Sequence, residues 1–209
     1  MNYNFITIEG NIGAGKTTLC HLLQQHFGAK LILEEFEDNS FLPKFYQNKE
    51  QYAFPLELSF MASRFNQLKE IINSRNLFGE KLISDYLFIK SKLFAKINLQ
   101  NDEYGLYEKL FEIINPNLPQ PDLLIYLHAP LIKLKENIKN RNRSYELDIS
   151  DDYLENLQDA YLEILNSLQI PILIVDALNT DFLNNKSHFN QLLSYLEKDF
   201  ESGKHYINF

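Results

Sequence analysis

The stretch Ile6-Thr7-Ile8-Glu9-Gly10-Asn11-Ile12-Gly13-Ala14-Gly15-Lys16-Thr17-Thr18 decides the fold class of this chain. It begins as an apolar strand, turns through a glycine-rich loop and enters a helix, and Gly10 to Thr17 match the pattern G-x-x-x-x-G-K-S/T in full. Glycines let backbone N–H groups approach phosphate oxygens, and the helix dipole favours the same anion. Lys16 can reach the β- and γ-phosphates, and the Thr17 hydroxyl can bind Mg²⁺. A chance glycine turn is the alternative, but the flanking strand and helix favour an ATP site over residues 10–18.

The composition excludes several classes of protein. A chain of 209 residues, with 45% hydrophobic and 23% charged residues, indicates one globular domain over residues 1–209. Its formal net charge of −8 argues against a general nucleic-acid-binding protein. The one cysteine, Cys20, permits no internal disulfide and lies on an apolar helix, so we expect it in the core. With no signal peptide or membrane-spanning stretch, we expect a cytoplasmic protein with neither nucleic-acid nor membrane partners.

Apolar stretches alternate with helical ones along the chain. We expect strands over residues 4–9, 30–34, 81–85, 122–127 and 170–175. Helices are expected over residues 18–27, 52–75, 88–98, 107–114, 131–140, 152–168 and 188–201, with a polar loop over 100–105. This order predicts an α/β fold, with a five-stranded parallel sheet covered by helices on both faces. Ligands of such sheets bind beyond the carboxyl ends of the strands, so Glu34, Glu35, Asp85 and the phosphate loop should surround one crevice.

Each charged residue near this crevice has two interpretations. Asp85 is a candidate Mg²⁺ ligand or a helix cap, and Glu34 is a candidate general base or one solvated acid in an acidic loop. Arg141 and Arg143 end a helix. On a mobile lid they would neutralise charge on a transferred phosphoryl group; otherwise they are cations favoured by the helix dipole.

The long predicted helix carries a further polar pair. Glu57, Met61 and Arg64 lie four and three residues apart, and therefore on one face of the helix. A carboxylate and a guanidinium two turns apart could bracket a planar polar ligand or could form a surface pair. The spacing leaves both possibilities open.

The order of these pieces resembles the cytosolic deoxynucleoside kinase family, which includes deoxyadenosine, deoxyguanosine and deoxycytidine kinases. The matching pieces span residues 4 to 175: the phosphate loop, the segment from Glu34 to Tyr46, the segment from Tyr52 to Arg64, strand 121–127 and Arg-Asn-Arg-Ser-Tyr-Glu at 141–146. The phosphate loop occurs in many families, whereas the other blocks are more specific. The resemblance implies a P-loop kinase fold with an arginine-rich lid.

The resemblance also implies a role for individual residues. Glu34 takes the place of the base that deprotonates the sugar 5′-hydroxyl, with Glu35 as the fallback. Tyr46 and Glu146 match the pair that binds the sugar 3′-hydroxyl, and Tyr52 and Glu57 belong to the acceptor pocket. Arg64 matches the arginine beside the catalytic carboxylate. Asp85 would bind metal and substrate, and Arg141 and Arg143 match the arginines of the lid. Lys16, Glu34, Arg64 and Arg141 are therefore the candidate catalytic residues, and Thr17 and Asp85 the candidate metal ligands.

Two positions depart from the family pattern. The family commonly has Glu/Asp-Arg-Ser after the third strand, whereas this chain has Asp85-Tyr86-Leu87, so Arg64 or a lid arginine would have to supply the missing charge. Glu57 stands where a base-reading glutamine is common. A glutamine donates and accepts, which suits adenine or cytosine. An ionised carboxylate only accepts and suits the N–H groups of guanine, unless Arg64 supplies a donor beside it.

These observations predict ATP-dependent 5′-phosphorylation of a deoxynucleoside, with deoxyadenosine expected first and deoxyguanosine second. Another small-molecule P-loop kinase, such as a nucleoside monophosphate kinase, is the alternative, although it would need a cationic site for its acceptor. A third possibility is an ATP-dependent switch with no acceptor, which would not need the pocket formed by residues 52–64. The resemblance further implies Mg²⁺ as cofactor, a homodimer, and feedback inhibition by a deoxynucleoside triphosphate.

Overall fold

Six parallel strands form the sheet of this protein. The computed structural model describes residues 2–36, 39–74 and 80–209. Within these residues the strands follow the order β2-β3-β1-β4-β5-β6. Their bounds are β1 Phe5–Gly10, β2 Lys30–Ile32, β3 Leu82–Ser84, β4 Leu123–His128, β5 Pro171–Asp176 and β6 Gly203–Ile207. The phosphate loop follows β1, which lies inside the sheet between β3 and β4, so the loop starts from a position buried on both sides.

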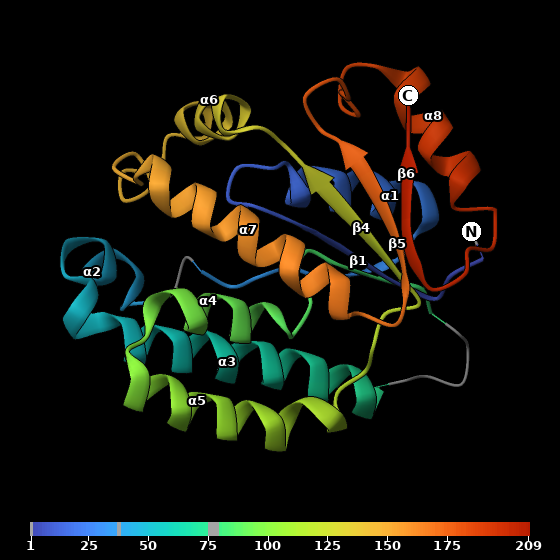
Figure 1. Ribbon diagram of the computed structural model, residues 1–209. Helices are drawn as coiled ribbons and strands as arrows, with labels where there is room; N and C mark the ends of the chain where they lie inside the picture. The colour runs from blue at the N-terminus through green and yellow to red at the C-terminus, as the bar shows by residue number, and fades with distance from the viewer. Residues whose placement is uncertain (1, 37–38, 75–79) are drawn as a thin grey trace.

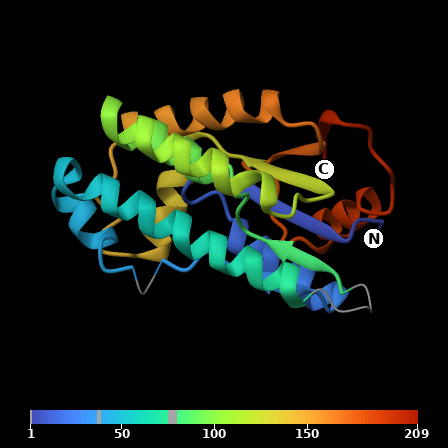
Figure 2. The ribbon, with the colours of Figure 1, turned by 90° about the horizontal axis from the view of Figure 1, so that it is seen from below.

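Helices cover both faces of the sheet (Figure 1). Their bounds are α1 Lys16–Phe27, α2 Leu42–Gln47, α3 Lys49–Ser74, α4 Lys90–Asn98, α5 Asn101–Ile114, α6 Leu131–Arg141, α7 Asp151–Ser167 and α8 Lys186–Tyr195, with a short 3₁₀ turn at Asn115–Asn117. Helices α1 and α8 pack on one face, and α3, α4, α5 and α7 on the other. Seen from below, the long α3 lies beside α5 (Figure 2). No helix in the described ranges is both long and apolar enough to cross a membrane.

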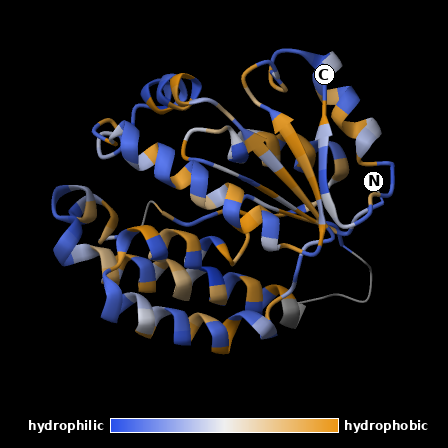
Figure 3. Cartoon of the chain, in the orientation of Figure 1, coloured by the Kyte–Doolittle hydropathy of each residue, from blue (hydrophilic) through white to orange (hydrophobic). Residues whose placement is uncertain are grey.

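Alternation along the central strands divides the core into two layers. In β4, Leu123, Ile125 and Leu127 join the cluster under α1 and α8, whereas Leu124 and Tyr126 face α4 and α7. All six residues of β1 are buried. Figure 3 colours the inner strands β4 and β5 mostly as hydrophobic, as expected of strands that are covered on both faces. Cys20 is fully buried on α1, which confirms its predicted place in the core.

The α/β fold with a parallel sheet is confirmed, but the predicted number of five strands is wrong. The sixth strand, β6, lies at the edge beside β5 and is half-exposed along most of its length. The predicted closing helix over 188–201 ends at Tyr195 as α8, and the chain then returns to the sheet. A short edge strand that carries polar residues has few apolar positions from which it could be predicted. For this reason the strand that ends at Ile207 was not predicted.

The starts of two helices differ from the prediction by three residues or more. Residues 101–105, predicted as loop, form the first turns of α5, because Asp102 and Glu103 suit a helix N-terminus and Tyr107 and Phe111 pack into the core behind them. The long helix α3 begins at Lys49, three residues before its predicted start. Its predicted end at Arg75 lies outside the described residues.

Gly13 shows how closely the phosphate loop packs against the fold. Its φ of +82° is left-handed, and a Cβ there would lie 2.7 Å from the backbone oxygen of Leu134 on α6. Both the backbone conformation and the available space therefore require glycine. In contrast, Gly105 lies within α5, and a Cβ there would enter open space.

These two glycines should respond to alanine in opposite directions. Gly13→Ala should lower the free energy of unfolding by about 1–3 kcal/mol, through strain and overpacking against α6. Gly105→Ala should raise it by about 0.5–1 kcal/mol, because alanine is the better helix former. Urea unfolding followed by circular dichroism measures both changes. Equal shifts in the two variants would contradict this view of the loop.

Candidate active site

A cavity of about 980 Å³ lies beyond the carboxyl ends of the strands. Its lining joins segments that are far apart in the sequence, as the strand order predicts. The predicted site residues that line it are Gly10, Ile12, Gly13, Ala14, Gly15, Lys16, Thr17, Thr18, Glu34, Tyr46, Glu57, Arg64, Asp85, Arg141, Arg143 and Glu146. The phosphate loop and the predicted acceptor residues therefore share one continuous space.

The phosphate loop is held by its own side chains. Lys16 Nζ donates hydrogen bonds of 2.9 Å to the backbone oxygens of Gly10 and Asn11. Burial, together with repulsion from Lys90, lowers the pKa of Lys16 to about 8. Asn11 is absent from the cavity lining. Its buried amide donates to the backbone oxygen of Leu154 at 2.8 Å, and so ties the loop to α7.

The carboxylate of Asp85 connects the phosphate loop to the segment after β2. Its Oδ2 accepts a hydrogen bond from Thr17 Oγ1 at 2.8 Å, and its Oδ1 accepts one from the backbone N–H of Glu34 at 2.7 Å. This second bond explains why β2 ends at Ile32, two residues before the predicted end. The chain leaves the sheet there and turns Glu34 into the cavity.

The donor atoms of Thr17 and Asp85 fit a magnesium ion that is bound together with a nucleotide. A hydroxyl and a carboxylate within hydrogen-bonding distance are hard oxygen donors, and Mg²⁺ in such sites takes one or two protein ligands and completes its shell with phosphates and water. Across the described residues, no cluster of three or more His, Cys, Asp or Glu side chains could hold a metal by itself. Any ion here would need the phosphates of the nucleotide.

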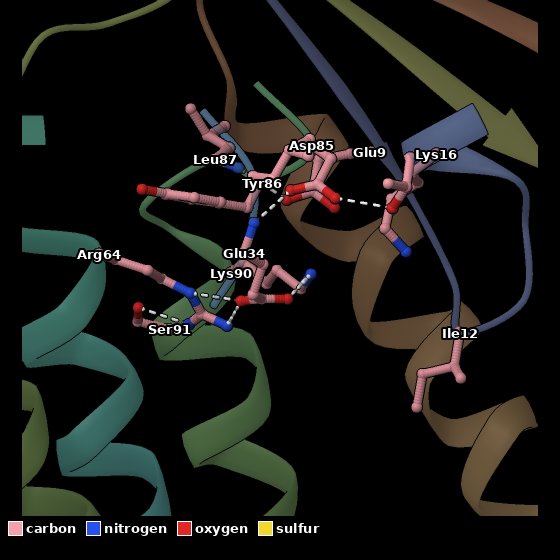
Figure 4. Close-up of polar contacts among 12 residues, drawn as sticks. Glu9, Ile12, Lys16, Glu34, Arg64, Asp85, Tyr86, Leu87, Lys90 and Ser91 are labelled. Carbon is pink, nitrogen blue, oxygen red and sulfur yellow. Dashed lines mark hydrogen bonds and ion pairs between the residues drawn. The ribbon is translucent and has the colours of Figure 1, made fainter. Parts of the chain in front are cut away.

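Glu34 lies between two cations (Figure 4). Its Oε1 accepts from Arg64 through both Nε, at 2.8 Å, and Nη2, and its Oε2 accepts from Lys90 Nζ at 2.7 Å. Arg64 is 3% exposed and donates its third bond to Ser91 Oγ at 2.7 Å, so its direction is fixed. Burial alone would raise the pKa of Glu34, but the two cations outweigh it and hold this pKa well below its ordinary value.

Glu34 and Glu35 differ in their positions. Glu35 is exposed, accepts a hydrogen bond from Ser63 and does not line the cavity, whereas Glu34 does. The charge expected from Arg64 beside Glu34 is present. The second cation is Lys90, which was not predicted from the sequence. A lysine in the first turn of a helix is usually exposed, and only the position of the third strand places this one at the crevice.

Tyr86, which replaces the family's arginine, belongs to the core. It is fully buried in the cluster formed by α3, α4 and α5, and its hydroxyl donates to Gln67. The backbone N–H of the next residue, Leu87, donates to the buried carboxylate of Glu9 at 2.8 Å. The segment after β3 is therefore fixed on both sides, with Asp85 facing the cavity.

Glu57 is a buried carboxylate with one free oxygen. Its Oε1 accepts a hydrogen bond from Asn98 Nδ2 at 2.7 Å, while Oε2 has no hydrogen-bond partner among the described residues. Burial raises the pKa of Glu57 to about 7. Glu57 and Arg64 both line the cavity, so the interpretation of this pair as a bracket around a ligand is favoured over a surface pair.

The two arginines of the lid donate hydrogen bonds to Glu146, a residue predicted to bind substrate. Arg141 Nη2 and Arg143 Nη1 both donate to the carboxylate of Glu146, the latter at 3.4 Å. The Arg143 guanidinium also lies 3.8 Å from the ring centre of Phe36. Tyr46 stacks on Tyr145 with ring centres 6.0 Å apart. Thus Tyr46, Glu146 and the lid converge on one wall of the cavity.

Tyr52 lies outside the cavity lining, although it was predicted to bind substrate. It packs against the small cluster of Phe45, Ala53 and Leu56, with Lys44 over its ring. Its position in the first turns of α3 supports the wall behind Tyr46. The block 52–64 thus contributes Glu57 and Arg64 to the cavity from its interior positions.

The family model described as deoxynucleoside kinase matches residues 6–200. The chain belongs to the deoxynucleoside kinase family. A deoxyguanosine kinase of Bacillus subtilis is 37% identical over 93% of this chain and 96% of its own length. A deoxyadenosine/deoxycytidine kinase of the same species is 31% identical over 92% of this chain and 91% of its own length. The kinase activity is therefore assigned to this protein. The third possibility, an ATP-dependent switch that has no phosphoryl acceptor, is excluded.

Solved structures agree with this assignment of the kinase. The deoxyadenosine kinase of M. mycoides with bound dATP superposes with a TM-score of 0.80 at 26% identity, covering 93% of this chain and 99% of its own. A second structure of that enzyme, with dCTP, has a TM-score of 0.78. The P-loop kinase fold expected from the resemblance is thereby confirmed.

The ion-paired Glu34 should make the stability of the kinase depend on pH. A carboxyl group whose pKa is lowered on folding stabilises the folded state above its unfolded pKa, and this contribution is lost as the pH falls. The difference in unfolding free energy between wild type and Glu34→Gln should therefore shrink by about 1–2 kcal/mol between pH 6 and pH 3.

Urea unfolding at each pH measures this difference. Glu35→Gln is the matched control, because it removes an exposed carboxylate at the next position. A difference for Glu34→Gln that stays constant over this range, or one reproduced by Glu35→Gln, would show that Glu34 is not held ionised by its neighbours.

Proposed function

We propose that the kinase transfers the γ-phosphoryl group of ATP to the 5′-hydroxyl of a purine deoxynucleoside, with deoxyguanosine ahead of deoxyadenosine. The observation that carries this proposal is the shared cavity, which is lined both by the phosphate loop and by Glu34 and Glu57. Glu34 accepts the proton of the 5′-hydroxyl, and the loop amides and Lys16 bind the phosphates of ATP.

The remaining residues position the two substrates. Thr17 and Asp85 would hold Mg²⁺, which would supply positive charge to the phosphates of the nucleotide. Tyr46 and Glu146 bind the sugar 3′-hydroxyl, and the binding of substrates transfers Arg141 and Arg143 from Glu146 to the phosphates. Catalysis then consists of orientation and electrostatic stabilisation, which suits phosphoryl transfer because little covalent chemistry is required of the protein.

The order of the two purines follows from Glu57. The sequence prediction placed deoxyadenosine first, whereas we place deoxyguanosine first. An ionised Glu57, with Oε2 free and Oε1 braced by Asn98, can accept from both N1–H and N2–H₂ of guanine. Adenine presents a donor and an acceptor, which a carboxylate matches less well. The relative that is 37% identical to this chain is a deoxyguanosine kinase, which agrees with this order.

A panel of four deoxynucleosides and adenosine, with the position of the product phosphate identified, tests the reaction itself. We expect 5′-dGMP and 5′-dAMP as the main products. Glu34→Gln should lower kcat by about 10²–10⁴, the usual contribution of a general base. Glu35→Gln should leave kcat near that of wild type. A Glu34→Gln enzyme with near-normal turnover would remove Glu34 from the mechanism, and phosphorylation of deoxynucleoside monophosphates alone would overturn the acceptor class.

Replacing Glu57 should change the base preference. Glu57→Gln should lower the ratio of kcat/KM for deoxyguanosine to that for deoxyadenosine by about 10–100-fold, because one hydrogen bond to guanine is lost and the amide donates to N1 of adenine. Glu50→Gln, an exposed change in the first turn of the same helix, is the control. An unchanged ratio would show that another residue reads the base.

The same carboxylate predicts a pH dependence. Because the pKa of Glu57 in the free enzyme is raised to about 7, kcat/KM for deoxyguanosine should fall as the pH drops below about 7, where the acid form cannot accept both N–H groups. Saturating ATP keeps Lys16 bound during the assay. The fall should be absent in Glu57→Gln, and its persistence there would assign the titration to another group.

A further inference from the structure

The two oxygens of Glu34 have different surroundings. Arg64 makes two hydrogen bonds to Oε1, which occupy both lone pairs of that oxygen, and a third to Ser91. Oε2 has Lys90 as its hydrogen-bond partner in the described part of the chain. An acceptor hydroxyl that gives its proton to Glu34 must therefore approach Oε2, beside the Lys90 ammonium (Figure 4).

Lys90 is placed where its remaining N–H bonds can be used. It lies in the first turn of α4, is 5% exposed and lines the cavity. An ammonium has three N–H donors, and the bond to Glu34 uses one of them. The ring of Phe94, 5.7 Å away on the next turn, closes off one side of the ammonium. The cavity is left as the open direction.

Neutralising Glu34 does not by itself explain Lys90. Arg64 already supplies a full positive charge to that carboxylate. A second buried cation is costly, and here it also repels Lys16 across the same cavity. Two ammonium groups that line one cavity, the half-buried Lys16 and the buried Lys90, are favourable once an anion lies between them. The γ-phosphoryl group in transit to the acceptor is such an anion, because charge spreads over its oxygens as it transfers.

We propose that Lys90 is a catalytic residue of this kinase, donating one hydrogen bond to Glu34 Oε2 and a second to the acceptor 5′-oxygen as the phosphoryl group arrives. The proposal rests on the proposed function. In the transfer, the 5′-O–H bond breaks and its proton goes to Glu34 Oε2. The 5′-oxygen forms a bond to the γ-phosphorus, the bond from that phosphorus to the β–γ bridging oxygen breaks, and its electron pair leaves with ADP. Lys90 keeps its proton throughout.

Substitutions of Lys90 separate this role from a structural one. Lys90→Met should lower kcat by about 10²–10³, the usual cost of removing one donor to a developing oxyanion, with KM for ATP and for deoxyguanosine within about threefold of wild type. Lys90→Arg should recover at least tenfold of that loss, because it retains a charged donor. Lys92→Met, two residues further along α4 and paired with Glu108 outside the cavity, should match wild type.

The pH profile gives a second readout. With Lys90 removed, Glu34 still faces two cations, Arg64 on α3 and Lys16 in the loop. It also faces the acidic or phenolic groups of Glu9, Glu57, Asp85, Tyr86 and Tyr161. Loss of the cation on Oε2 should move the acid limb of kcat upward toward the ordinary carboxyl range. This movement shows that Lys90 sets the charge of Glu34 during turnover, whereas a loss of kcat that persists at pH values above the limb reports the bond to the 5′-oxygen.

The outcomes distinguish this proposal from the proposed function. If wild type phosphorylates deoxynucleosides and Lys90→Met keeps kcat within about threefold, Lys90 is not catalytic and the proposed function stands. If wild type phosphorylates no deoxynucleoside, both fail. If Lys90→Met does not fold, Lys90→Gln applies the same criterion with a neutral polar side chain. A loss of kcat with an unmoved acid limb and no recovery in Lys90→Arg would also overturn the catalytic role.

Discussion

The carboxylate of Asp85 joins the two sides of this active site. One oxygen binds the hydroxyl of Thr17 in the phosphate loop, and the other binds the backbone N–H of Glu34. Because Asp85 follows β3, which pairs with both β1 and β2, it couples the strand before the loop to the segment that carries Glu34, the proposed base. The separation between the phosphate loop and Glu34 thus depends on the register of three neighbouring strands.

The parts of the fold that could be predicted are those in which local chemistry has one solution. The phosphate loop is such a case, because its left-handed glycines and its place between strand and helix admit few alternatives. The inner strands are another, since burial on both faces requires continuous apolar runs. Glu34, Glu57, Arg64 and Asp85 reach one cavity because strand ends and one helix face bring them there, which the alternation of elements already implied.

The parts that were missed depend on tertiary contacts. Edge strand β6 has few apolar residues, and the first turns of α5 look polar until Tyr107 and Phe111 are packed behind them. Lys90 is one of many lysines until its helix is placed against Glu34. The homodimer, the magnesium ion, the cytoplasmic location and the individual catalytic roles remain predictions, because they concern partners and chemistry beyond a single chain.

Glu57 and Arg64 are seven residues apart on α3, a rise of about 10 Å along the helix axis. In the proposed function, Glu57 binds the edge of the nucleobase, and Arg64 directs the carboxylate of Glu34 toward the 5′-hydroxyl. The helix therefore fixes the distance between the sites for the two ends of the acceptor, because its backbone hydrogen bonds keep its length constant. A change at position 57 can alter which base is accepted without altering where the hydroxyl is held. In such a kinase the base selectivity can change during evolution while the phosphoryl-transfer reaction is retained.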